Sequence, residues 1–249
     1  MQSGVATKIF LLEEPENHLS HSNLNSLISS ISNKAAGKQL ILTTHSSFVL
    51  NKLGIENVML FTRNGCMTLQ DLTDDTRDYF LKLPGHDTLR MILSKRVILV
   101  EGPSDELVVM KAYKKVHGVL PLEHGVDIVS VKSLAFKRFL EISKLLKIAV
   151  AVVTDNDGSI DTLKSKYLGF LDIAHIQICF SSDETLKTLE PQICAKNSLA
   201  NLNLALNKKF NSVDEVCEYM SINKTDSALA IFNSKIDLNW PDYILKAIG

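Results

Sequence analysis

The sequence has few of the residues that mark unusual protein classes. Its 249 residues include only 11 Gly, 6 Pro and 4 Cys, so collagen-like, low-complexity and disulfide-rich chains are excluded. The longest apolar runs, such as Ile148 to Val153, are far shorter than the ~20 residues that a membrane-spanning helix needs. The start of the chain lacks the basic segment and apolar stretch of a secretory signal peptide. We therefore expect a globular cytoplasmic protein without membrane association.

Net charge and cysteine spacing lead to two further expectations. The formal net charge is only -1, so binding of a polyanion such as DNA would require a local basic surface rather than overall attraction. The cysteines Cys66, Cys179, Cys194 and Cys217 lie far apart and form no CxxC pair. This spacing predicts reduced, buried thiols.

Apolar segments alternate with amphipathic segments in the second part of the chain, which is the pattern of an α/β fold. Strands are predicted at 97–101, 126–129, 148–154 and 176–180. Helices are predicted between them at 104–116 and 133–146. Continuous Val, Ile and Leu strands separated by helices indicate a parallel sheet that is covered on both faces.

A break around Pro84-Gly85 divides the chain into two predicted domains, 1–90 and 91–249. The first contains a shorter strand, helix and strand series at 9–44, followed by a hairpin at 57–69 with its turn at Arg63-Asn64-Gly65. The second contains the longer series and a mainly helical region from Lys196 onwards.

Acidic residues follow two strands of the second domain. Glu101 ends one strand and begins Glu101-Gly102-Pro103-Ser104-Asp105, and a later strand runs into Asp155-Asn156-Asp157-Gly158. Ligands of a parallel sheet bind at the carboxyl ends of its strands, so these carboxylates are expected to meet. Carboxylates that meet repel each other unless cations lie between them, and oxygen ligands suit Mg²⁺ or Mn²⁺. Turn and capping preferences explain each motif alone, but the two together favour a metal site.

The two motifs resemble the Toprim domain, the metal-binding module of topoisomerases, primases and certain nucleases, over about residues 95–195. The Toprim pattern is a Glu that ends the first strand and a DxD that ends the third, and both are intact here. The resemblance implies a Rossmann-like parallel sheet. Ser159, directly after the second motif, is either a further metal ligand or the cap of the next helix.

The first domain also carries polar residues at the ends of its strands. The run from Ile9 ends in Glu13 and Glu14, and in phosphoryl transfer one acid of such a pair organises Mg²⁺ while the other orients or deprotonates water. The run from Leu40 ends before His45, where an imidazole can sense a γ-phosphate. Each segment alone is also typical of a strand with a capped exit. In this order they resemble the Walker B strand and switch histidine of ABC-type ATPases, with Glu13 where that family more often has Asp.

An ATPase segment followed directly by a Toprim domain is similar to the OLD-family nucleases (overcoming lysogenisation defect), which include the Gabija defence nuclease. The resemblance implies ATP as a regulator, a homo-oligomer formed through the ATPase region, and a role in anti-phage defence, with a possible defence partner, or in DNA processing. Neither a GxxxxGK[ST] phosphate loop nor an LSGGQ-like signature is present. We therefore do not expect this chain alone to hydrolyse ATP. It is expected to be the carboxyl-terminal part of a longer protein, or a short form whose ATPase half is vestigial or completed by a partner.

In OLD-family Toprim domains, an acidic residue in a TLE-like segment and a later lysine belong to the active site. The resemblance transfers these roles to Glu190 and Lys224 by position and local pattern. A solvated surface position is the alternative for Lys224, and the nearby acids Asp183 and Glu184 compete with Glu190.

The resulting hypothesis is a DNA endonuclease that uses two Mg²⁺ or Mn²⁺ ions. Its expected metal ligands are Glu101, Asp105, Asp155, Asp157 and Glu190. Its expected catalytic residues are Glu101, Asp155 and Lys224. Lys224 would stabilise phosphate charge, and Glu101 is also a candidate general acid or base.

Two other functions fit parts of the sequence. A topoisomerase or primase-type enzyme also uses a Toprim domain, but strand passage needs a tyrosine nucleophile. None of Tyr113, Tyr167, Tyr219 and Tyr243 has surroundings of that kind. A regulatory or assembly module that binds metal without turnover is the non-enzymatic alternative. The basic segment 132–147 is expected to pack its Leu and Phe stripe on the sheet rather than to bind DNA.

Overall fold

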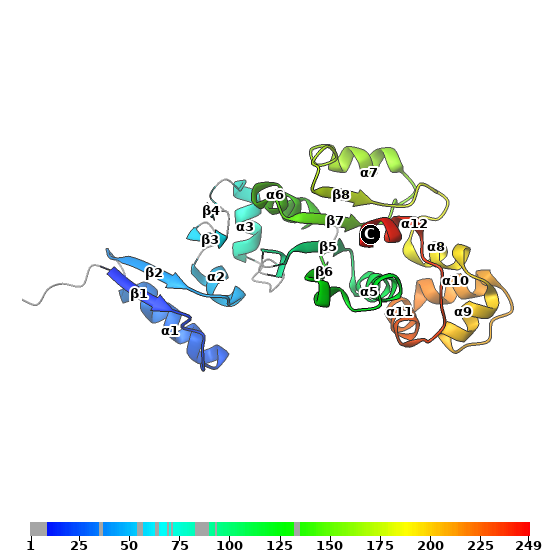
Figure 1. Cartoon of the computed structure of the whole chain (residues 1–249), viewed down its shortest axis with the longest axis horizontal. Helices are drawn as coiled ribbons and strands as arrows, with labels where there is room; N and C mark the ends of the chain where they lie inside the picture. The colour runs from blue at the N-terminus through cyan, green and yellow to red at the C-terminus, as the bar shows by residue number, and fades with distance from the viewer. Residues whose placement is uncertain are drawn as a thin grey trace, which may run out of the picture. The chain divides into compact units, whose positions relative to one another are not determined.

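The computed structural model describes all residues except 1–8, 35–36, 54–56, 63–64, 69, 71, 83–89, 93 and 132–134. The chain divides into two compact units, Met1–Leu89 and Arg90–Gly249 (Figure 1). Within the described ranges, no helix has both the length and the apolar character needed to cross a lipid bilayer.

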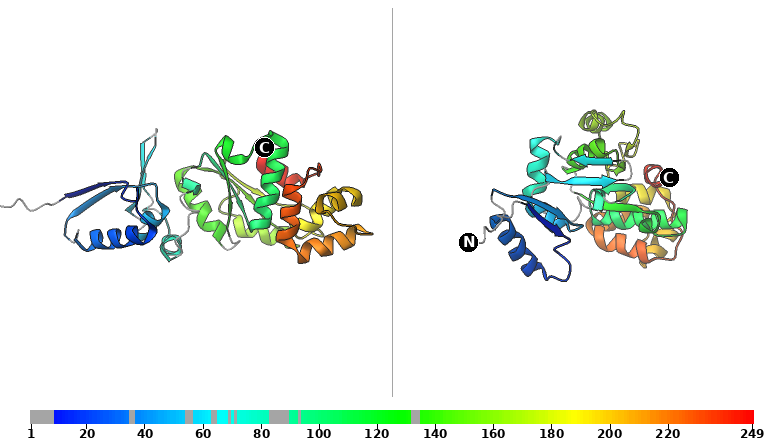
Figure 2. Two further views of the ribbon diagram at one scale, coloured as in Figure 1. Left: turned by 90° about the horizontal axis from the view of Figure 1, so that it is seen from below. Right: turned by 60° about the vertical axis from the view of Figure 1, so that its left-hand side comes forward.

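The first unit is built on a small parallel sheet. Strands β1 (Ile9–Glu13) and β2 (Gln39–Thr43) pair in parallel and are connected through helix α1 (His21–Lys34). Helix α1 lies along one face of this sheet (Figure 2). With helix α2 (Ser47–Leu53) it contributes to a small core around Leu24, Ile28 and Val49. Alternate strand residues such as Leu11 remain exposed.

The first unit continues with a hairpin and a helix. Strands β3 (Met59–Thr62) and β4 (Gly65–Thr68) pair in antiparallel fashion, which confirms the hairpin predicted at 57–69. Helix α3 (Asp74–Lys82) follows. The predicted turn residues Arg63 and Asn64, and the Pro84-Gly85 break, lie outside the described residues.

The second unit contains a four-stranded parallel sheet in the order β6-β5-β7-β8, as predicted for an α/β fold. The strands are β5 (Arg96–Val100), β6 (Val126–Ser130), β7 (Ala149–Val153) and β8 (Ile176–Cys179). The connecting helices are α5 (Pro103–His117), α6 (Phe136–Leu146) and α7 (Ile160–Tyr167), and a short 3-10 helix, η2 (Pro121–His124), precedes β6. Because β6 and β7 flank β5 on opposite sides, the carboxyl ends of β5 and β7 form the switch point where ligands of such sheets bind.

Both faces of this sheet are covered, which explains its continuous apolar strands. Ile98 and Val100 join a core cluster that also includes residues of α5 and of α12 (Asp242–Ile248). Successive strand side chains point to opposite faces, so the buried residues Val97 and Leu99 face the other side of the sheet. Helix α6 contacts β7 and β8 and buries its Phe and Leu stripe. The predicted packing role of this basic segment is confirmed from Phe136 onwards, and 132–134 lie outside the described residues.

A helical region completes the second unit and packs against α5. Its helices are α8 (Leu189–Lys196), α9 (Leu199–Leu206), α10 (Val213–Ile222), α11 (Lys224–Asn233) and α12. Helix α11 contacts α5, and α12 contacts β7 and β8. The helical region begins slightly earlier than predicted, at Leu189. The predicted site residue Glu190 is the second residue of α8, and the predicted site residue Lys224 is the first residue of α11.

Candidate functional site

The register of β5 and β7 places Glu101 beside the turn that carries Asp155. Leu99 pairs with Val152, so Glu101 lies level with Thr154 just beyond the strand ends. The Thr154 hydroxyl donates a hydrogen bond of 2.6 Å to Glu101 Oε1, and the backbone N–H of Asp155 donates one of 3.3 Å to the same oxygen. Glu101 therefore points toward the Asp155–Gly158 turn.

Asp105 lies in the first turn of α5, close to Glu101. Its Oδ2 accepts a hydrogen bond of 3.0 Å from the backbone N–H of Gly102, which helps to begin the helix. Burial, and then the negative charges of Glu101 and Glu190, raise the pKa of Asp105 to about 6. The carboxyl groups of Glu101 and Glu190 therefore lie within electrostatic reach of Asp105.

Asp155 is the most strongly affected carboxyl of this group. Burial, and then the charges of Asp105, Glu101 and Glu190, raise its pKa to about 8. The positive charge of Lys224 opposes this rise. The structure therefore brings together four of the five predicted metal-binding carboxylates and the predicted lysine.

Glu190 and Lys224 form an ion pair although they lie on different helices. Glu190 is in the first turn of α8 and its side chain is only 6% exposed, whereas Lys224 begins α11 and is half-exposed. The Lys224 Nζ atom lies 3.4 Å from Glu190 Oε1. Glu190 Oε2 is buried and has no hydrogen-bond partner among the described residues. A buried carboxylate oxygen without a partner is costly and is a suitable ligand for a cation.

The two acids that compete with Glu190 in the sequence have local structural roles. Asp183 Oδ1 accepts hydrogen bonds from the backbone N–H and the hydroxyl of Thr185. Glu184 Oε1 accepts one of 2.7 Å from the backbone N–H of Ile160, at the start of α7. Both side chains are exposed.

Asp157 and Ser159 occupy the outer part of the same turn. Asp157 is exposed, has a positive φ of 50°, and lines a small pocket with Asp155, Ser159 and Lys166. The Ser159 hydroxyl accepts a hydrogen bond of 3.3 Å from the backbone N–H of Thr162 and so caps α7. Capping is one of the two roles that the sequence left open for Ser159.

These carboxylates do not form a ready-made metal site. In the part of the chain that the structure describes, no group of three or more His, Cys, Asp and Glu side chains is arranged to hold a metal ion. Each of three carboxyl groups has another partner instead: Glu101 accepts a hydrogen bond from Thr154, Asp105 accepts one from Gly102, and Glu190 pairs with Lys224. A shared ion would require at least some of these side chains to turn.

Sequence reasoning missed two further residues near these carboxylates. Tyr243 of α12 is 5% exposed, and burial and then the charges of Asp155 and Asp105 raise its pKa well above the usual value. Asn156 is buried between the two acids of the turn. The position of Tyr243 near the carboxylates follows only from the packing of α12 against the sheet. Asn156 could have been identified from the sequence, because it lies within the acidic motif.

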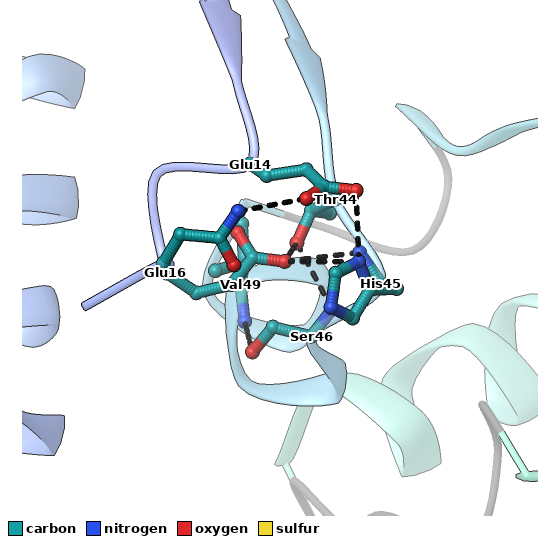
Figure 3. Close-up of polar contacts among 7 residues, drawn as sticks. Glu14, Glu16, Thr44, His45, Ser46 and Val49 are labelled. Carbon is teal, nitrogen blue, oxygen red and sulfur yellow. Dashed lines mark hydrogen bonds and ion pairs between the residues drawn. The ribbon is translucent and has the colours of Figure 1, made fainter. Parts of the chain in front are cut away.

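A second polar cluster lies at the carboxyl ends of β1 and β2 in the first unit (Figure 3). The His45 ring atom Nδ1 lies 3.1 Å from Glu14 Oε1, and Asn17 donates a hydrogen bond of 2.8 Å to the other oxygen of Glu14. Glu14 has a positive φ of 40°. The structure therefore brings Glu14 and His45 together, whereas Glu13 is exposed at the end of β1.

Glu16 is a member of this cluster that sequence reasoning missed. Its Oε1 accepts hydrogen bonds from the Thr44 hydroxyl at 2.5 Å and from the backbone N–H of His45 at 3.0 Å. Burial alone would raise its pKa, but these hydrogen bonds and the His45 ring lower the pKa below the ordinary value. Its other oxygen is buried without a hydrogen-bond partner among the described residues.

One segment in each unit matches a known family. Residues 92–157 of the second unit match the family described as "Overcoming lysogenization defect protein-like, TOPRIM domain". Residues 2–51 match the family described as "AAA domain, putative AbiEii toxin, Type IV TA system". The chain is thus similar to part of an AAA domain in its first unit and to an OLD-like Toprim domain in its second.

Solved structures similar to this chain include C-terminal regions of bacterial OLD proteins. The region from Xanthomonas campestris pv. campestris, phased with platinum, is 20% identical, with a TM-score of 0.46 and coverage of 64% of this chain and 92% of that chain. The region from Burkholderia pseudomallei is 15% identical, with a TM-score of 0.45 and coverage of 62% and 96%. No curated protein matches the sequence significantly.

Proposed function

We propose that the second unit is a divalent-metal-dependent DNA endonuclease. The observation that carries this proposal is the group formed by Glu101, Asp105, Asp155 and Glu190, four carboxylates from separate segments at the switch point of the sheet. Burial, and then their mutual repulsion, raise the pKa values of Asp105 and Asp155. Bound cations would stabilise the ionised form of carboxyl groups that are gathered away from water in this way.

The donor set fits Mg²⁺ or Mn²⁺, because all of its ligand atoms are carboxylate oxygens. Glu101, Asp105, Asp155, Asp157 and Glu190 would hold two ions, and the unpartnered Glu190 Oε2 is available without breaking a hydrogen bond. Such ions supply an activated water and stabilise the leaving oxygen in phosphodiester hydrolysis.

The protein's own residues would bind and orient the DNA phosphate. Lys224 is half-exposed, so its ammonium group can reach solvent and neutralise phosphate charge while it remains beside Glu190. The hydrogen bond from Thr154 fixes the Glu101 carboxylate, which would also hold or transfer a proton as a general acid or base. Asp155, next to Glu101, completes the proposed catalytic set.

We further propose that the first unit links this activity to ATP. Glu14, Glu16 and His45 form a polar cluster at the ends of parallel strands, which is suited to Mg²⁺ and phosphate. Because the sequence lacks a phosphate loop, ATP would bind only together with an ATPase part that carries one. By resemblance to the OLD family we also propose a homo-oligomer formed through this region, and a role in anti-phage defence or DNA processing, with or without a defence partner.

One observation favours an alternative, a regulatory or assembly module without turnover. The carboxylates are engaged with other partners and do not form a ready ion site within the described residues. A topoisomerase-type reaction is less well supported, because Tyr243, which lies near the carboxylates, is buried and cannot reach DNA.

Plasmid nicking with Mn²⁺ tests the endonuclease proposal. Glu101→Gln and Lys224→Ala should each reduce the cleavage rate by about 100-fold or more, because each removes a group that acts on the reacting phosphate or its ions. Glu218→Gln and Lys235→Ala change exposed residues of the same types and should cleave like the wild type. If the wild type binds Mn²⁺ by calorimetry but cuts no DNA, the assembly module is supported instead.

A further inference from the structure

Asn156 joins the acidic turn to a loop that lies far from it in sequence. Its side chain is 1% exposed. Its Nδ2 group donates hydrogen bonds to the backbone carbonyls of Ser181, at 3.0 Å, and Asp183, at 2.7 Å. Its Oδ1 accepts one of 2.9 Å from the backbone N–H of Gly158. One buried amide therefore fixes both the turn that carries Asp155 and the loop between β8 and α8.

This link is needed because the backbone pairing of the two strands stops before the acidic turn. The last backbone hydrogen bond between the strand exits runs from Thr154 N–H to the Cys179 carbonyl, at 3.1 Å. Beyond it, Asn156 and Glu184 connect the two exits through their side chains, the latter by its bond to Ile160. The hydrogen bonds of these two residues therefore help to set the separation of turn and loop.

The loop in turn positions Glu190. Asp183 and Thr185 form a tight local turn, and the next residue, Leu186, accepts a hydrogen bond of 3.0 Å from Gln192 Nε2. Gln192 is a buried residue of α8, two positions after Glu190. A continuous series of hydrogen bonds therefore runs from the Asp155 turn through the loop to the helix that carries Glu190.

We infer that Asn156 is a positioning residue that sets the distance between the Asp155 turn and Glu190, and that Glu184 assists it. An amide is required at 156 because two donors must meet two carbonyls. A carboxyl group there would place an acceptor oxygen against those carbonyls and add a third acidic group between Asp155 and Asp157. This inference rests on the proposed metal site, since its consequence is the geometry of the proposed ligands.

Calorimetric titration of the full chain with Mn²⁺ tests this role separately from DNA cleavage. Asn156→Ala should weaken Mn²⁺ binding about 10- to 100-fold, the usual cost of losing a residue that orients metal ligands. The matched control is Asn197→Ala. Asn197 is also a buried amide: it donates hydrogen bonds to the backbone carbonyls of Ile193 and Asn239 and accepts one from the backbone N–H of Asn239. The Asn197→Ala substitution should lower the Tm but leave the Mn²⁺ dissociation constant unchanged.

A second pair of variants keeps the test valid if Asn156→Ala does not fold. Glu184 is exposed, so Glu184→Ala should fold and weaken Mn²⁺ binding by a smaller factor, while Glu184→Gln, which keeps an oxygen acceptor for Ile160, should restore it. Unchanged Mn²⁺ affinity in a folded Asn156→Ala protein, or in Glu184→Ala if the former is unfolded, overturns the positioning role while the proposed function stands. Absence of Mn²⁺ binding in the wild type overturns both.

Discussion

Asp155 is held where burial and three nearby carboxylates oppose its ionisation, with Lys224 as the opposing positive charge. A folded-state pKa of about 8 means that the folded metal-free protein binds a proton that the unfolded chain, with its ordinary carboxyl, has already released. Asp105, whose pKa is raised to about 6, acts in the same direction. Both groups therefore stabilise the folded protein at low pH. They destabilise it as the pH rises and their carboxyl groups lose protons within the fold.

We expect the Tm of the metal-free protein to fall as pH rises from about 5 to about 8, through the range between the ordinary carboxyl pKa and that of folded Asp155. Mn²⁺ should reduce this fall, because a cation stabilises the ionised carboxylates. Thermal unfolding in EDTA and in Mn²⁺ across this pH range measures both effects.

The matched variant is Asp155→Asn, which cannot ionise. It should raise the Tm in EDTA more at pH 8 than at pH 5 and should make the pH dependence flatter. A Tm in EDTA that increases from pH 5 to pH 8 in the wild type would show that the carboxylates do not repel each other as the structure indicates.

At the scale of elements, the turn between β7 and α7 depends on Gly158. This residue has a φ of +82°, a conformation that side chains other than glycine rarely adopt, and an added Cβ would lie 3.0 Å from Cε of Lys187. Gly158→Ala should therefore reduce the free energy of unfolding by about 1 kcal/mol. It should also weaken Mn²⁺ binding, because the same turn carries Asp155 and Asp157.

Gly169→Ala is the control for this turn, since nothing lies within 4 Å of its added Cβ and it has no positive φ. Denaturant unfolding and Mn²⁺ titration of the two variants make the comparison. Equal stability and equal Mn²⁺ affinity in the two proteins would show that the conformation of Gly158 is not required.

The elements themselves were largely predictable. Strands expected at 97–101, 126–129, 148–154 and 176–180 appear within one residue or so as β5 to β8, because continuous Val, Ile and Leu runs are long enough to identify. Helix α11 begins at Lys224, the lysine that the sequence analysis named as a site residue. The order β6-β5-β7-β8 was not predictable from the strand pattern, because every buried strand presents a similar apolar run.

At the scale of the whole molecule, the described residues of the two units form cores of different size. Unit 2 encloses a four-stranded sheet and a large cluster of buried residues from its strands and helical region. Unit 1 has a two-stranded parallel sheet, with the exposed apolar residues Leu11 and Ile41 on its strands and a small cluster around Ile28. Parallel sheets are usually covered on both faces, and two-stranded sheets are marginally stable alone.

We therefore expect a fragment comprising residues 90–249 to unfold cooperatively and to bind Mn²⁺ with the affinity of the full chain. A fragment comprising 1–89 should show no cooperative transition by circular dichroism. A fragment of 90–249 that is unfolded, or that binds Mn²⁺ much more weakly than the full chain, would contradict the assignment of the whole proposed site to the second unit.

The sequence alone determined the α/β class, the strands, and the two acidic motifs that follow them, since these depend on local residue patterns and on the rule that ligands bind at strand ends. Tertiary structure decided which side chains meet. It paired Glu190 with Lys224, placed Tyr243 near the carboxylates, and gave Asn156 its partners in a distant loop. Such contacts join residues far apart in the chain, so they follow from the packing of helices on the sheet and not from any local pattern.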